Sequence, residues 1–199
     1  GSTFGNNVAD TGTVIFNQSG VLSATGVISG SGVVIQSGSG TTVLTGANTY
    51  SGSTNISAGV LNISGTGSLG GGSYAGTIVN NGGLVFNTST NQLLTGVISG
   101  TGSLTQSGAS TLTLTGANTY SGSTTISNGT LDLVANGALG AGSTTIQANG
   151  ILQIGNGTAN GIVPSSLGSI TNNGYIAFDQ ASGNVTTVNA SLSGTGGLI

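Results

Sequence analysis

The sequence predicts an all-β protein, namely a right-handed parallel β-helix of about nine coils with roughly 20–27 residues each. Three observations favour this fold: a very high glycine content (40 of 199 residues), alternation of apolar and polar residues, and long segments that recur at a fixed interval. Gly and Asn favour turns, whereas Val, Ile and Thr favour pleated strands. Leu112 and Leu114 alternate with Thr residues at the period of two that indicates a strand, and helical periodicity is absent.

The strongest repeat is the segment L-T-G-A-N-T-Y-S-G-S-T, which occurs at Leu44–Thr54 and again at Leu114–Thr124 and defines a 70-residue period. The period extends into the flanks, since G-V-I-S-G-S-G at 26–32 returns as G-V-I-S-G-T-G at 96–102. Repeats of this kind are typical of solenoids, in which each unit buries its apolar face only by stacking on its neighbours. We interpret the 70-residue period as a super-repeat of three coils.

The smaller unit is a Gly followed two residues later by an apolar residue that is expected to open a strand. The spacing of these positions, about 20–27 residues, is the length of one solenoid coil. We expect the openers to stack in the core on equivalent sides of successive coils. They are Val14, Val34, Leu61, Leu84, Leu104, Leu131, Leu152, Ile176 and Leu198.

The whole chain, residues 1–199, is predicted to be a single β-helix segment of a longer repeat protein, because it begins without Met and stops within a repeat. Its repeats are expected at about 11–80 and 81–150, with a partial repeat at 151–199, and residues 1–10 fit the pattern least. Asn-Gly pairs precede several openers and predict turns with positive φ at their glycines. These pairs are 81/82, 128/129, 149/150 and 173/174.

The segment Thr111–Leu131 resembles the passenger-associated strand repeat of bacterial autotransporters, which has a Leu-x-Leu-x-Gly-x-Asn-Thr-Tyr-x-Gly-x-Thr core and a closing Gly-x-Leu. Thr41–Leu61 is similar to the same repeat. The resemblance implies a β-helical passenger of a type V autotransporter or adhesin, secreted to the Gram-negative cell surface through an outer-membrane barrel expected elsewhere in the full-length chain. The residues of the structural motif are Leu44, Gly46, Asn48, Tyr50, Gly52, Leu114, Gly116, Asn118, Tyr120 and Gly122.

The composition excludes several functional classes, because the chain contains no Lys, Arg, His or Cys. Nucleic acids and anionic membrane surfaces require cationic side chains to neutralise phosphate, so neither is an expected partner. A nucleophilic Ser would lack its His or Lys base. The three carboxylates, Asp10, Asp132 and Asp179, are predicted to lie isolated in different coils, unlike a paired acid–base site. We therefore expect no catalytic, metal or cofactor site, and no enzyme activity.

The function that we predict is a structural and adhesive rod of a bacterial surface or secreted fibre, which self-assembles laterally or end to end. One alternative is a glycan-binding module, with Tyr50 and Tyr120 beside Asn48 and Asn118 on an exposed face. A minor alternative is an ice-binding solenoid, for which the Thr-x-Thr run at 111–115 is suitable although equivalent coils lack it. Since so few groups titrate, folding stability is expected to vary little with pH.

Overall fold

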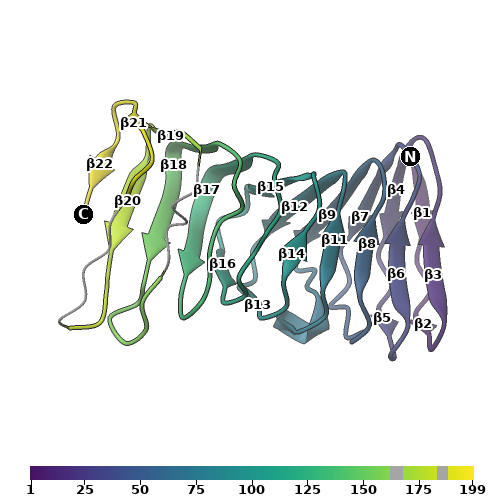
Figure 1. Ribbon diagram of the computed structural model, residues 1–199. Helices are drawn as coiled ribbons and strands as arrows, with labels where there is room; N and C mark the ends of the chain where they lie inside the picture. Colours follow the sequence, from purple (N-terminus) through teal and green to yellow (C-terminus); the bar gives the residue numbers. More distant parts are fainter. Residues whose placement is uncertain (162–167, 183–187) are drawn as a thin grey trace.

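The structure is a computed structural model that describes residues 1–161, 168–182 and 188–199, and it shows a parallel β-helix (Figure 1). Strands from successive turns pair in parallel along the rod, and the chain advances from one end to the other without returning. The single helical element of the described ranges is a 3-10 turn, η1 (Gly70–Gly72). The predicted all-β solenoid fold is confirmed.

Three faces surround the interior. Face 1 contains β1 (Ser2–Phe4), β4 (Val21–Ala24), β7 (Thr41–Leu44), β9 (Val60–Gly65), β12 (Gly83–Thr88), β15 (Ser103–Gln106), the first parts of β17 (Thr124–Leu133) and β18 (Thr144–Ile154), β19 (Ile170–Asn172) and β21 (Leu192–Ser193). Face 2 contains β10 (Ser73–Tyr74), β13 (Gln92–Leu94), β16 (Thr111–Leu114), the last parts of β17 and β18, β20 (Tyr175–Phe178) and β22 (Gly197–Leu198). Face 3 contains β3 (Thr13–Phe16), β6 (Val33–Gln36), β8 (Thr54–Ile56), β11 (Ile78–Asn80) and β14 (Ile98–Ser99), and β2 (Val8–Ala9) pairs with β5 (Ile28–Ser29).

The turn length follows from the ladder of paired residues on face 1. This ladder joins Ser2 to Leu192 in nine steps, or about 21 residues per turn, which is the size of a solenoid coil. The shortest step runs from Thr42 to Leu61, and the longest runs from Thr144 to Ile170. The predicted number of about nine turns is therefore correct.

The 70-residue period is longer than three turns, which corrects the interpretation of a three-coil super-repeat. On face 3, three turns from Val34 lead through Thr54 and Ile78 only to Ile98, short of Leu104, its equivalent in the next repeat. The period thus corresponds to three turns plus about one third of a turn. As a result, Leu44 lies on face 1 in β7, whereas its repeat equivalent Leu114 lies on face 2 in β16.

The nine strand openers do not form one stack, in contrast to the expectation from the sequence pattern. Val14 and Val34 belong to face 3, the next three to face 1, and the last four to face 2. The reason is that some rungs are polar: Val34 pairs with Thr54 and Leu104 pairs with Thr124. The openers on face 1 are Leu61, Leu84 and Leu104, and those on face 2 are Leu131, Leu152, Ile176 and Leu198.

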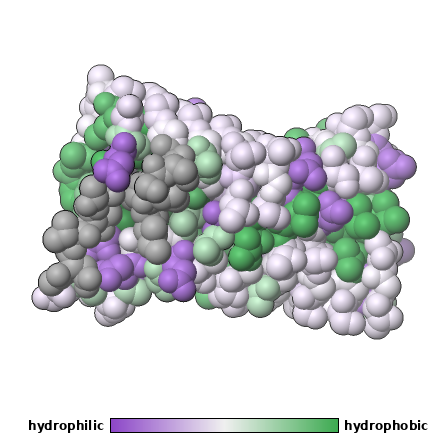
Figure 2. Space-filling view, viewed as in Figure 1, coloured by the Kyte–Doolittle hydropathy of each residue, from purple (hydrophilic) through white to green (hydrophobic). Residues whose placement is uncertain are grey.

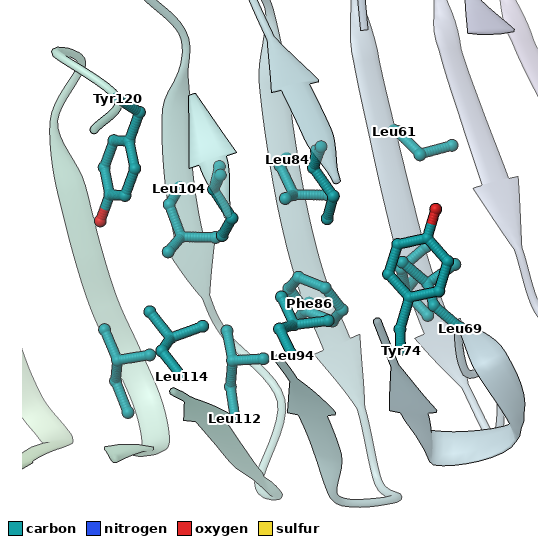
Figure 3. Close-up of a cluster of buried hydrophobic side chains, with 14 of the residues drawn as sticks. Leu61, Leu69, Tyr74, Leu84, Phe86, Leu94, Leu104, Leu112, Leu114 and Tyr120 are labelled. Carbon is teal, nitrogen blue, oxygen red and sulfur yellow. The ribbon is translucent and has the colours of Figure 1, made fainter. Parts of the chain in front are cut away.

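The interior is filled by stacked side chains from all three faces, and Figure 3 shows leucines of faces 1 and 2 among them. Leu61, Leu84 and Leu104 form one fully buried column, and Leu94 and Leu114 belong to another on face 2. Burial of each such side chain contributes about 1.5–3 kcal/mol. Seven openers, from Val34 to Ile176, are buried, whereas Val14 is half-buried and Leu198 is 58% exposed. Val14 and Leu198 lie in the end turns, where the column is covered on one side only.

The Asn-Gly pairs were expected to need positive φ, but only Gly129 has it, with φ 66°. At Gly150 and Gly174 the requirement is space rather than a turn conformation. A Cβ atom at Gly150 would overlap the carbonyl oxygen of Ile126 in the preceding turn, and one at Gly174 would overlap that of Gln147. Close stacking of successive turns therefore selects glycine at these positions.

Candidate functional site

The repeat motif forms an internal corner in which an asparagine side chain replaces part of a strand. Asn48 is fully buried, and its Oδ1 accepts a hydrogen bond from the backbone N–H of Ile28 at 2.9 Å. Its Nδ2 donates to the carbonyl oxygens of Gly46 at 2.9 Å and Ser68 at 3.2 Å. One amide thus satisfies backbone groups of three successive turns at a bend where the β ladder is interrupted.

The second copy repeats this corner with one difference. Asn118 Oδ1 accepts from the backbone N–H of Ile98 at 2.8 Å, and Nδ2 donates to the carbonyl oxygen of Ala138 at 2.8 Å. Within the described ranges, the second N–H of this amide has no hydrogen-bond partner in the protein, and Asn118 is 7% exposed. The second corner is therefore slightly open to solvent.

The motif tyrosines point into the interior. Tyr50 OH lies 2.7 Å from Thr54 Oγ1, which in turn lies 2.8 Å from Tyr74 OH, and the Tyr50 and Tyr74 rings meet edge to face at 5.4 Å. Tyr120 OH lies 2.7 Å from Thr124 Oγ1 in the same way. Burial raises the pKa of all three tyrosines, so each hydroxyl is protonated at neutral pH.

The motif glycines also act inside the fold, since they allow close contact between turns. A Cβ atom at Gly46 or Gly52 would overlap the carbonyl oxygen of Gly26 or Gly32 one turn earlier, and Gly116 and Gly122 stand in equally close contact with the turn before them. The tyrosines and asparagines that the sequence offered as sugar contacts are buried. A binding surface at either copy must therefore be built mainly from other residues.

Two of the three carboxylates lie closer together than the sequence suggested. Asp132 projects from β17 and pairs with Gln153 of β18, which pairs with Ala177, two residues before Asp179. Burial and the charge of Asp179 raise the pKa of Asp132 to about 6. In the described parts of the chain, no three residues of the types His, Cys, Asp and Glu gather to hold a metal ion. The two carboxylates, two turns apart, thus interact electrostatically.

The outer surface of face 1 carries two columns of hydroxyl side chains over five successive turns. Thr105, Thr125 and Thr145 pair in register, followed by Thr171 and Ser193. Two residues before each of these positions stands a serine, at 103, 123, 143, 169 and 191. Because alternate strand residues point to the same side, the columns form a flat lattice of hydroxyls, about 4.8 Å by 6.7 Å. Ser-x-Thr triplets at this spacing would have predicted the lattice from the sequence. A search for apolar strand openers does not detect them.

The Thr-x-Thr run at 111–115, by contrast, does not continue into neighbouring turns. Thr113 in β16 pairs with Leu93 on one side and with Asp132 on the other. Among the ladders of the described residues, the hydroxyl lattice of face 1 is therefore the one repeated array of this kind.

Face 3 has a more apolar exterior in the N-terminal half of the molecule, where Figure 2 shows green side chains gathered along the rod. Ile15 pairs with Ile35 on this surface, and Val79 follows after Asn55. Ile15 is 59% exposed. We call Ile15, Ile35 and Val79 the apolar stripe.

A groove with a volume of about 590 Å³ lies outside the second motif corner. Thr95, Thr115, Thr119 and Asn136 line it, together with the apolar Val97 and Ala117. The small residues of the motif, Gly116 and Ala117, produce the hollow.

In the ranges that the structure covers, no helix is long and apolar enough to cross a membrane.

Comparison with known proteins identifies the repeat. The sequence profile of the family described as Passenger-associated-transport-repeat matches residues 34–63 and 104–133. Both matches begin at a strand opener and include the buried asparagine corner; the first ends within β9 and the second at the last residue of β17. Two segments of the chain are therefore similar to this repeat.

A curated relative extends this assignment. Over 90 residues, the chain is 56% identical to the Adhesin BmaC autotransporter of Brucella suis biovar 1 (strain 1330). The alignment covers 45% of this chain but only 3% of the relative, so the chain corresponds to a very small part of that protein's length. No solved structure matches the chain significantly.

Proposed function

We propose that this chain is part of the passenger of an autotransporter adhesin, secreted or displayed on a Gram-negative cell surface, where it acts as a structural and adhesive rod rather than as an enzyme. The observation that carries the proposal is that both passenger-associated-transport-repeats lie within one continuous β-helix whose interior is formed by the motif residues. The outer surface, which bears no cationic side chain, is then the part that contacts other molecules.

Beads coated with the folded chain test the adhesive role. We expect them to attach to epithelial cells or extracellular matrix more strongly than beads coated with the thermally unfolded chain, because attachment depends on surfaces that only the stacked turns create. Equal attachment of the two preparations would contradict the proposal.

Contact between copies of the rod is a further part of this proposal, and the apolar stripe on face 3 supports it. A net charge of −3 gives little repulsion between copies, and exposed apolar side chains favour association. Sedimentation velocity over a range of concentrations should show dimers or larger species that Ile15→Lys and Val79→Lys together abolish. A chain that stays monomeric at the highest concentration would exclude this contact.

A second candidate function, ice binding, is favoured by the hydroxyl lattice on face 1. Periodic water can match a periodic array of hydroxyls, and the lattice includes neither a charged nor an aromatic residue. Partition of the chain into slowly growing ice tests this candidate. Thr125→Tyr, at the centre of the lattice, should keep the chain in the liquid fraction. The control Thr113→Tyr on face 2 should leave partition into ice unchanged. Exclusion of the unaltered chain from ice would rule the candidate out.

A further inference from the structure

We propose that the groove outside the second motif corner binds a neutral carbohydrate. The proposal rests on the adhesive role proposed above and names a ligand class for it. The groove lies on the outer surface of the rod. It is formed by Thr115 and Ala117, which follow β16, and by Asn136, which follows β17.

The groove is open because of the turn that follows the motif. After the first copy, the step from Leu61 to Leu84 includes η1, whose Gly71 N–H donates to the carbonyl oxygen of Asn48 at 2.7 Å. After the second copy, the step from Leu131 to Leu152 is two positions shorter and forms no such 3-10 turn. Thr49 thus lies against Gly71 of η1, whereas no 3-10 turn follows the second copy, although Thr49 and Thr119 are both exposed.

Exposure leaves a hydrogen-bond donor at the base of the groove. Asn48 Nδ2 donates to two carbonyl oxygens, whereas Asn118 Nδ2 donates to that of Ala138 alone among the described residues. Asn118 lines the groove although its side chain is more than nine-tenths buried. A buried donor with one unused N–H is costly unless a ligand or water accepts its hydrogen bond.

The lining selects a neutral polyhydroxyl ligand. Thr95 and Thr119 can each donate and accept, as sugar hydroxyls do, and Asn136 adds an amide. Thr115, whose hydroxyl donates to the carbonyl oxygen of Leu94 at 3.4 Å, can still accept. Val97, 37% exposed, offers an apolar contact for the C–H face of a pyranose ring. With no cationic side chain in the protein, acidic glycans and phosphorylated ligands have no counter-charge. An open groove without an aromatic platform predicts weak binding per site, strengthened when many copies act together.

The experiment uses the intact chain on multivalent beads against a panel of neutral oligosaccharides of glucose, galactose and N-acetylglucosamine, with sialylated versions in parallel. We expect binding to one or more neutral members. Thr119→Val, which keeps the side-chain shape but removes a groove hydroxyl, should weaken that binding about fivefold or more. Ala117→Trp, which fills the groove, should abolish it.

The matched control is Thr49→Val, since Thr49 has the same local sequence as Thr119 but lies against Gly71 of η1. Binding should be unchanged in this variant. Absence of neutral-glycan binding, preference for sialylated glycans or for peptides, or equal effects of Thr119→Val and Thr49→Val would each overturn the proposal. If Ala117→Trp beads still attach to cells, the adhesive role stands and the groove is not its site.

Discussion

Leu44–Thr54 and Leu114–Thr124 are identical in sequence, but they lie on different faces of the β-helix and differ in what covers them. Inside, the two copies agree closely, with tyrosine–threonine distances of 2.7 Å in both. The next turn along the chain differs between the copies. The first copy is followed by η1 and Tyr74, and the second by a shorter turn with Thr144 at the position equivalent to Tyr74.

The comparison shows which properties the repeated segment specifies by itself. In both copies the corner asparagine bonds to the turn before it and to the turn after it, the tyrosine bonds to the threonine four residues later, and the glycines stand close to the turn before them. These contacts therefore recur. The turn that follows, by contrast, varies: it includes η1 after the first copy and is shorter, without a 3-10 turn, after the second. The internal contacts are therefore shared by the copies, whereas the neighbouring surface turn differs.

The largest effect is expected at positions where both copies need glycine equally. Gly52→Ala and Gly122→Ala each place a Cβ against a backbone carbonyl oxygen of the preceding turn, and each should lower the free energy of unfolding by about 3 kcal/mol. Gly20→Ala is the control, since its Cβ would meet nothing within 4 Å. Chemical denaturation measures all three, and a tolerated Gly122→Ala would show that the turns stack less closely in the second copy.

The corner asparagines should separate the copies. Asn48→Ala leaves the N–H of Ile28 without its partner, but the carbonyl oxygens of Gly46 and Ser68 still accept from the backbone N–H of Asn48. Asn118→Ala removes the described partners of both the Ile98 N–H and the Ala138 carbonyl oxygen. At about 1 kcal/mol for each unsatisfied group, Asn48→Ala should lose about 1 kcal/mol of stability and Asn118→Ala about 2 kcal/mol. Thermal unfolding at matched concentration compares them. Equal losses would mean that water satisfies the Ala138 carbonyl oxygen at the second corner.

A smaller effect with opposite signs is expected for two buried threonines. Thr54 Oγ1 joins two tyrosine hydroxyls, so Thr54→Val should destabilise the protein by about 1–2 kcal/mol. Thr144 Oγ1 is buried without a partner, so Thr144→Val should leave stability unchanged or raise it by up to about 1 kcal/mol. Urea midpoints of the two variants give the comparison, which fails if both lose stability.

The smallest effect is expected for Asp132, whose equivalent in the first copy is Asn62. Because the fold raises the pKa of this carboxyl from 3.8 to about 6, the native state favours its protonated form. Stability from this group is therefore complete below pH 3.8 and is lost as the pH rises through 6. The melting temperature should be slightly higher at pH 4 than at pH 7, and Asp132→Asn should remove the difference. A melting temperature that falls on acidification would contradict this assignment.

Much of the architecture could be predicted from sequence, because alternation, glycine content and repeat length all depend on local chemistry. The phase of the repeat could not, since buried polar rungs such as Thr54 and Thr124 occupy columns that leucine fills elsewhere. Turns in which a polar residue occupies the column are therefore not recognised when apolar strand openers are used to count turns. For the same reason the Ser-x-Thr lattice on face 1 was missed. The electrostatic influence of Asp179 on Asp132 required knowledge of how the turns stack.

The extra third of a turn in each 70-residue period has a consequence for any longer array of these repeats. Each copy is rotated relative to the one before it, so three copies in succession look outward in three different directions, and the fourth returns to the first. Equivalent residues of successive repeats would then follow a helical path around the rod. Such a rod presents the same residues in every direction around its axis, so it can contact a surface in any orientation about that axis.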